Sequence, residues 1–163
     1  MKKIVRIATF IPMLCMMFLI WGFSANSGEV SSRQSQGIVS HIVDFVEDIT
    51  DITLSAEEQF IWEERIHTPV RKLAHITEYM IFTLTVAFPL SQYFKNVKLI
   101  RRITFIFCIL YASLDEIHQR FIPGRSGQFR DVIIDGIGIG IGIFIYSLIR
   151  RKISKSNGTD NME

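Results

Sequence analysis

The chain has 163 residues, of which 48% are hydrophobic and 21% are charged, and its formal net charge at pH 7 is +2. This length suits one domain, and the small net charge without a basic stripe excludes an extended nucleic-acid surface. Cys15 and Cys108 lie in apolar stretches without metal or redox spacing, so we interpret them as packing residues. The hydrophobic residues occur in blocks too long for a soluble domain.

Four apolar stretches occupy much of the chain: Ile7 to Phe23, Leu73 to Phe94, Ile103 to Leu114 and Val132 to Ile149. A membrane core about 30 Å thick takes roughly 20 helical residues to cross. The second and fourth stretches reach that length, the first nearly does, and the third needs its polar flanks. We therefore predict an all-α, polytopic membrane four-helix bundle with helices at about 5–23, 71–94, 101–119 and 131–150.

The first stretch also has features of a cleaved signal peptide. A basic segment from Met1 to Arg6 precedes it, and small residues follow it at 25–27. Its apolar core of about 17 residues exceeds the usual range of roughly 7 to 15. We therefore favour a retained membrane helix.

Basic residues predict the orientation of these helices. They form three clusters: Lys2, Lys3 and Arg6; Lys95, Lys98, Arg101 and Arg102; and Arg150, Arg151 and Lys152. The positive-inside rule places all three clusters, and both termini, in the cytoplasm. The segment 24–70 and the loop 119–130 then lie outside. Residues 153–163 are polar and are predicted to be a disordered cytoplasmic tail.

The outer segment 24–70 is predicted to contain two short amphipathic helices. One helical face of the first carries Ile38, Ile42, Phe45, Val46 and Ile49. The second begins at a capping-box pattern formed by Ser55 and Glu58. Pro69 is predicted to end the segment and to begin the second membrane helix. The outer helices either pack for stability, on the membrane surface or over the bundle, or form a lid over a site.

With this topology, polar residues at the outer ends of three helices meet at one level. They are Arg71, His75 and Glu78 on the second helix; Asp115, Glu116, His118 and Gln119 on the third; and Asp131 and Asp135 on the fourth. The three on the second helix are spaced i, i+4 and i+7 and share one face. Ionisable groups at membrane depth are costly and usually mark function. We therefore predict a polar site in the outer leaflet.

The fourth helix carries two small-xxx-small pairs, Gly136 with Gly140 and Gly138 with Gly142. Such pairs let a neighbouring helix approach closely. The spacing fits neither a P-loop nor a dinucleotide-binding motif. We therefore predict that these glycines serve helix packing.

The outer loop contains Arg120, Arg125 and Arg130, which oppose the usual charge bias of such a loop. These arginines either pair with the acidic residues at the ends of the third and fourth helices or form an anion site. The second interpretation rests on the match of guanidinium groups to phosphate and carboxylate. Pro123 and Gly124 predict a turn within the loop.

The chemistry of the polar cluster leaves alternatives open. The candidate catalytic residues, for acid–base work, are His75, Glu78, Glu116, His118 and Asp131. The candidate substrate-binding residues are Arg71, Asp115, Gln119, Arg125 and Asp135. Two imidazoles with carboxylates suit a divalent metal, but no metal-ligand motif accompanies them, and we predict no metal and no cofactor. The other alternative is a buried structural network of charges without chemistry.

Several motifs, taken in order, resemble the VanZ-like family of bacterial membrane proteins. They are Arg71-Lys72-Leu73-Ala74-His75, Glu78-Tyr79, Asp115-Glu116-Ile117-His118-Gln119, Arg125, Asp131, Asp135 and Gly138. The resemblance runs from about Arg71 to Gly142, and we expect one VanZ-like membrane domain over 1–152. It implies a place in the bacterial cell membrane and, through the family's best-known branch, low-level resistance to the glycopeptide antibiotic teicoplanin.

The chain departs from that branch at two points. Asp135 stands where an asparagine is expected, and the pair His75 and Glu78 belongs to a different subgroup. The pair Glu116 and Gln119, by contrast, looks similar to the branch, as does Asp131.

Three functions are consistent with these features. The first is a membrane enzyme or modifier that acts on an anionic envelope component, such as a lipid-linked or cell-wall intermediate, or on a glycopeptide antibiotic. The second is a protein that binds or shields an envelope target without chemistry. The third, a small transporter, is disfavoured because no ionisable residue near the cytoplasmic half completes a path. Membrane lipids and a lipid-linked or cell-wall ligand are the expected partners, and nucleic acid is not.

Overall fold

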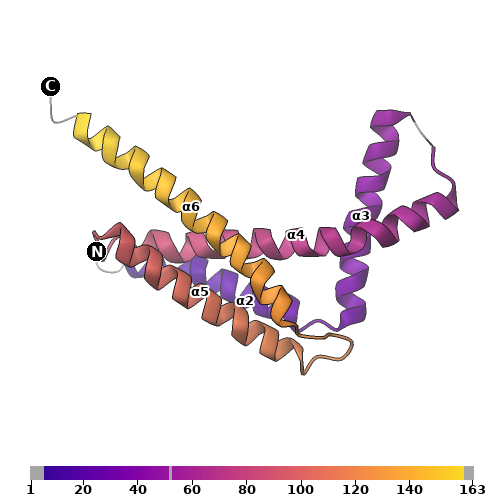
Figure 1. The fold of residues 1–163 in the computed structure, drawn as a ribbon, viewed down its shortest axis with the longest axis horizontal. Helices are drawn as coiled ribbons and strands as arrows, with labels where there is room; N and C mark the ends of the chain where they lie inside the picture. Colours follow the sequence, from indigo (N-terminus) through magenta and orange to yellow (C-terminus); the bar gives the residue numbers. More distant parts are fainter. Residues whose placement is uncertain (1–5, 52, 160–163) are drawn as a thin grey trace.

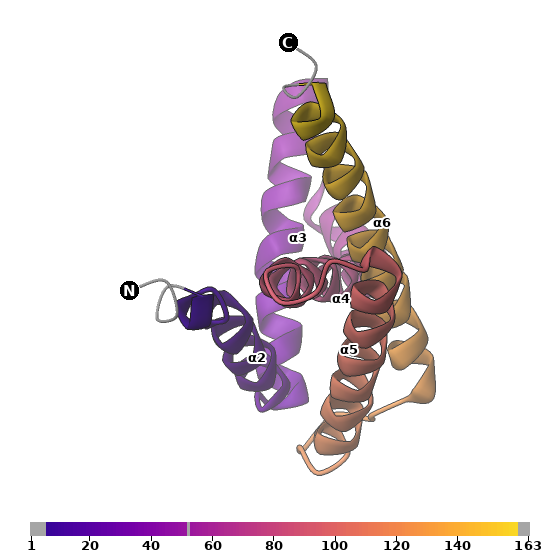
Figure 2. The same cartoon turned by 90° about the vertical axis from the view of Figure 1, so that its left-hand side faces the viewer.

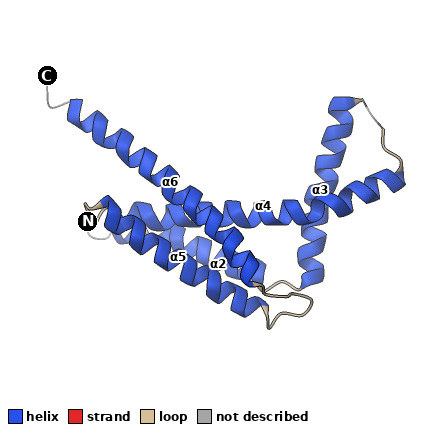
Figure 3. Ribbon diagram, in the orientation of Figure 1, coloured by secondary structure: helices blue, strands red, loops and turns tan. Residues whose placement is uncertain are grey.

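The computed structural model describes residues 6–51 and 53–159, and these residues form helices and loops without a strand (Figures 1 and 3). The main helices are α2 (Ile11–Ser24), α3 (Gly28–Thr50), α4 (Ala56–Leu90), α5 (Val97–Gln119) and α6 (Phe129–Thr159). The all-α class predicted from the sequence is confirmed for this part of the chain. The predicted start of the first helix at residue 5, the basic residues Lys2 and Lys3 and the end of the tail, 160–163, lie outside the described residues.

Helix α4 differs most from expectation. The capping box is confirmed, since the Ser55 side chain accepts from the Glu58 N–H and the Ser55 N–H donates to the Glu58 carboxylate at 2.9 Å. The helix then continues for 35 residues through Pro69, where we expected one helix to end and another to begin. A proline within a helix removes one backbone hydrogen bond at a cost of about 3 kcal/mol, and packing on neighbouring helices can offset it. The first outer helix is present as α3, with 23 residues, but the second is not a separate short helix and forms the start of α4.

Helix α6 is also longer than the sequence indicated. It runs to Thr159 and so includes residues 153–159 of the segment predicted to be a disordered tail. The loop before it contains the predicted turn, in which Gly124 has a φ of +74°. The Gly28 N–H donates to the Pro123 carbonyl at 3.0 Å and ties the start of α3 to this loop.

The helices pack around one long element. Helices α2, α5 and α6 all contact α4, with α6 slanting along it, and α3 runs across α4 (Figures 1 and 2). Buried apolar side chains from α2, α4, α5 and α6 form a common core, including Ile20, Phe82, Ala112 and Ile139. Large apolar side chains point outward elsewhere, with Phe18 78% and Phe144 63% exposed. Such surfaces suit contact with lipid.

In the part of the chain that the structure describes, three helices are long and apolar enough to cross a membrane: Arg6–Ser24, Ala56–Leu90 and Phe129–Ser154. Helix α5 does not qualify, because any 18-residue window of it holds more than two charged residues, drawn from Lys98, Arg101, Arg102, Asp115 and Glu116. The structure thus supports a membrane protein, while the four-helix membrane bundle remains a prediction.

One of the two glycine pairs packs closely against α4. A Cβ at Gly138 would overlap the Ile76 carbonyl, and one at Gly142 would lie 2.7 Å from Thr83 Cβ. Gly140, by contrast, has open space around it. The predicted packing role therefore holds at Gly138 and Gly142, which lie one and two turns after Asp135 and bring α6 against α4.

The predicted apolar face of α3 is not its buried face. Ser35, Val39 and Val43 are buried, whereas Phe45 is 64% and Ile49 is 66% exposed. The end of α3 near Thr50 extends beyond the other helices (Figure 1). Small and polar residues of α3 thus face the rest of the molecule.

Candidate functional site: a polar cavity beside α4

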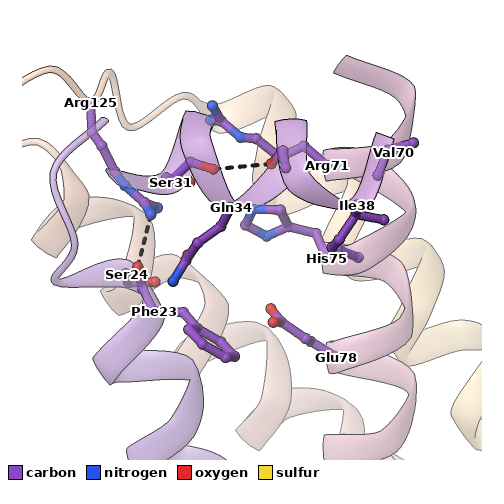
Figure 4. Close-up of a pocket in the computed structure, with 12 residues that line it drawn as sticks. Phe23, Ser24, Ser31, Gln34, Ile38, Val70, Arg71, His75, Glu78 and Arg125 are labelled. Carbon is purple, nitrogen blue, oxygen red and sulfur yellow. Dashed lines mark hydrogen bonds between the residues drawn. The ribbon is translucent and has the colours of Figure 1, made fainter. Parts of the chain in front are cut away.

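A cavity of about 350 Å³ lies between the end of α2, α3 and α4. We call it the outer cavity, and its lining consists of Phe23, Ser24, Ser31, Gln34, Ser35, Ile38, Val70, Arg71, Ala74, His75, Glu78 and Arg125. Figure 4 shows His75 and Glu78 projecting from α4, with Gln34 and Arg125 on other sides of the space. The three residues predicted to share one face of α4 thus line the same cavity.

Arg125 is held entirely by neutral acceptors. Its Nε donates to the Asn26 carbonyl at 2.9 Å, its Nη1 to Gln119 Oε1 at 3.1 Å and its Nη2 to the Phe23 carbonyl at 2.8 Å. Burial, followed by repulsion from Arg71, lowers the pKa of Arg125, yet a guanidinium stays charged in proteins. The cavity therefore holds a fixed positive charge that no carboxylate of the described residues pairs with.

A buried hydrogen-bond network holds one of the acceptors of Arg125 in place. Ser24 Oγ donates to Asp115 Oδ2 at 2.7 Å, and Gln119 Nε2 donates to the same oxygen at 3.0 Å. Because Gln119 Nε2 is bound to Asp115, its Oε1 is left facing Arg125. Asp115 and Gln119, predicted to bind substrate, thus act in this structure by positioning Arg125.

His75 and Asp135 form the second feature of the site. His75 Nδ1 lies 3.3 Å from Asp135 Oδ1, and the Asp135 side chain is 1% exposed. Within the described residues, neither Asp135 oxygen has a hydrogen-bond partner with good geometry. A buried carboxylate is costly unless it is paired, so an imidazolium at His75 is its natural partner.

Glu116 and His118 lie apart from the lining of the outer cavity. Glu116 Oε2 accepts from the Gln128 N–H at 2.9 Å and so fixes the loop before α6. The His118 ring stacks on Trp21 with 4.0 Å between ring centroids. Asp131 lines a second cavity, whose wall includes Arg71 and His75. The five candidate catalytic residues therefore do not share one cavity.

The loop arginines do not pair with the acidic helix ends. Across residues 6–51 and 53–154, the ion pairs are Arg33 with Glu29 and His75 with Asp135. Arg120 Nε donates instead to the Gly127 carbonyl at 3.2 Å. The first interpretation of these arginines is thus not supported by the described residues. The same ranges contain no group of three or more His, Cys, Asp or Glu side chains arranged to hold a metal ion.

Sequence reasoning missed part of the lining. Gln34 and Ser35 lie three and four residues after Ser31, and this polar stripe on α3 was a usable signal. His67 lies four residues before Arg71 and lines the second cavity with it. It was overlooked because Pro69 was read as a helix boundary.

Comparison with known proteins agrees with the motifs. Searches of curated proteins and of solved structures gave no match. The family described as VanZ/LLP1 matches residues 9–150, which include every residue of both cavities. Because the match covers most of the 163 residues, the chain belongs to the VanZ/LLP1 family.

Proposed function

We propose that this protein recognises an anionic component of the bacterial cell envelope in its outer cavity. The observation that carries the proposal is the pair Arg71 and Arg125, which line one cavity without an ion pair to a described carboxylate. A charged group held in place by neutral acceptors is preorganised for an anion. Such a ligand would supply the missing counter-charge.

The rest of the lining narrows the kind of ligand. Phe23, Ile38, Val70 and Ala74 give the cavity an apolar part beside its charged part. Pockets with apolar walls and a few convergent polar groups suit organic ligands. A lipid-linked or cell-wall intermediate combines the two kinds of surface, and so does a glycopeptide antibiotic. The position of the cavity outside the cytoplasm follows from the predicted topology.

The proposal has a catalytic and a non-catalytic form. His75 and Glu78 line the cavity together, and an imidazole beside a carboxylate is suited to general acid–base catalysis. In the catalytic form, these residues transfer a proton to or from the bound ligand. In the non-catalytic form the protein only binds or shields it. Turnover of the ligand by the wild-type protein, and its loss in Glu78→Gln, distinguishes the two forms.

Ligand binding by the purified protein in lipid nanodiscs tests the proposal. Arg71→Gln is the informative variant, because no side-chain hydrogen bond of Arg71 is lost from the described structure. Loss of one charge-assisted hydrogen bond, worth about 1.5–3 kcal/mol, should weaken binding of a lipid-linked cell-wall intermediate roughly 10- to 100-fold.

Arg33→Gln is the matched control, since Arg33 is exposed on α3 and pairs only with Glu29. It should bind as the wild type does. Equal affinity of wild type and Arg71→Gln for every anionic envelope ligand tried, teicoplanin included, would contradict the proposal. In cells, teicoplanin susceptibility with and without the protein tests the resistance branch of the proposal separately.

A further inference from the structure

A second cavity of about 330 Å³ adjoins the outer cavity at Arg71 and His75 of α4, and the α5–α6 loop and the start of α6 complete its lining. We call it the basic cavity. Its charged and imidazole side chains are His67, Arg71, Lys72, His75, Arg130 and Asp131. Three permanent cations and two imidazoles therefore face one space with a single carboxylate from that set.

These cations lack partners within the described residues. None of Arg71, Lys72 and Arg130 lies in an ion pair there, and Asp131 does not either. His67 Nε2 is buried without a hydrogen-bond partner in the same part of the chain. Like charges around one space repel one another, more at the partly buried Arg71 than at the exposed Lys72 and Arg130, and an anion between them lowers that cost.

Neutral donors complete the wall. Thr68 and Ser126 bring hydroxyl groups, and the Gln128 side-chain amide donates to Ser126 Oγ at 3.1 Å. The backbone of this loop is held in place, because the Gln128 N–H is bound to Glu116 and the Gly127 carbonyl to Arg120. Guanidinium, ammonium and hydroxyl donors around one space match the oxygens of a phosphoryl group.

We propose that the basic cavity binds the phosphoryl group of a phosphorylated ligand. The inference rests on the proposed function and deepens it, since it adds a phosphate or diphosphate site next to the anion site of the outer cavity. Arg71 and His75 belong to the walls of both cavities. A phosphorylated amphiphile can therefore extend through both cavities, with a phosphoryl group in the basic cavity and its other anionic and apolar parts beside Arg125, Phe23 and Ile38 in the outer cavity.

Binding to full-length protein in phosphatidylcholine nanodiscs tests this inference in two arms. One arm adds inorganic phosphate or pyrophosphate and measures binding by calorimetry. The other adds phosphatidic acid or a polyprenyl phosphate, with diacylglycerol and polyprenol as uncharged controls, and measures binding by native mass spectrometry. Binding in the lipid arm alone identifies a lipid headgroup as the source of the phosphoryl group, and binding in both arms identifies phosphate itself as sufficient.

Lys72→Gln and Arg130→Gln are the test variants, since both side chains line the basic cavity and not the outer one. Each should weaken phosphoryl binding about 10-fold, the equivalent of one charge-assisted contact of about 1.4 kcal/mol. Arg65→Gln removes the same charge from an exposed position of the same helix and should leave binding unchanged. Asp131→Asn should strengthen binding a few-fold, because it removes the carboxylate that repels the phosphoryl group.

The outcomes separate this inference from the proposed function. One result would overturn the phosphoryl site in the basic cavity: unchanged phosphoryl binding in both Lys72→Gln and Arg130→Gln. If binding were weaker in Arg71→Gln and in Gln34→Ala of the outer cavity at the same time, the ligand site in the outer cavity would still be supported. Absence of binding in both arms overturns the phosphoryl inference, while binding of a non-phosphorylated anionic ligand still supports the proposed function.

Discussion

The two ends of the helical core are filled in different ways. Near the α4–α5 connection the core is apolar, where Ala87 and Ile100 pack with Tyr146. At the α5–α6 end the buried side chains include Asp115, Glu116 and Asp135, each at most 4% exposed. These are the buried carboxylates of the described residues, and all three lie at one end of the fold.

This difference shows which end of the fold is less stable than an apolar core would be. Apolar burial stabilises by about 25 cal/mol per Å², whereas a buried carboxylate costs free energy unless it is paired. Both cavities lie at the costly end, and Arg71 and His75 line each of them. Such an arrangement is typical of a functional site, because packing alone is better achieved with apolar residues.

The orientation of the helices in the membrane decides which side the polar end faces, and its test has the largest expected effect. Reporter fusions after Lys155 and within Lys95 to Arg102 should read cytoplasmic, and fusions within Ser31 to Thr68 should read external. The polar end then faces the envelope. An external reading for the tail would place both cavities on the cytoplasmic side and remove the envelope ligand from the proposed function.

His75→Ala should cause the largest loss of stability among single substitutions at the polar end. It leaves Asp135, with its side chain 1% exposed, without its partner at 3.3 Å. Removing one member of a buried pair costs about 3–5 kcal/mol of the free energy of unfolding. Adding Asp135→Asn to His75→Ala should recover most of that loss in denaturant unfolding of the purified protein. Equal instability of the single and double variants would show that the pair is not the source.

Gly138→Ala tests the close approach of α6 that positions this pair. Its Cβ would overlap the Ile76 carbonyl, so the two helices must separate, at a cost of about 1–3 kcal/mol. Gly140→Ala adds the same methyl group where nothing lies within 4 Å and should unfold like the wild type or be slightly more stable. Thermal unfolding of both variants compares them directly, and equal melting temperatures would contradict the packing role.

Local signals in the sequence predicted local structure. The capping box at Ser55 and the turn at Pro123 and Gly124 depend on neighbouring residues and were predicted. The extent of α4 was not, because a proline in a long helix is retained or excluded by tertiary packing that local patterns do not encode. Because the helix was expected to begin at Pro69, His67 was not recognised as part of the helical face that carries Arg71 and His75.

The environment of Arg125 could not be predicted, for a different reason. Two of its three acceptors are the carbonyl oxygens of Phe23 and Asn26, 102 and 99 residues away. Every residue has a carbonyl oxygen, so no residue type marks these partners. The sequence indicated which side chains carry charge at the polar end, but only the fold shows which charges stay unpaired.

The smallest expected effect concerns His118. It was a catalytic candidate in the sequence, and in the structure its ring stacks on Trp21. If its role is packing, His118→Ala should lose about 0.5–1.5 kcal/mol of stability, the usual worth of an aromatic pair. His118→Phe should restore that stability, because it keeps a ring at the same place.

Turnover of the ligand by the His118 variants distinguishes a packing role of His118 from a catalytic one. A packing role predicts that His118→Phe behaves as the wild type does, whereas in the catalytic form of the proposed function Glu78→Gln in the outer cavity loses turnover. A catalytic role predicts that both His118 variants lose turnover while they remain folded, since phenylalanine cannot transfer a proton. The second result would extend the functional part of the polar end from the cavity walls to the α2–α5 contact.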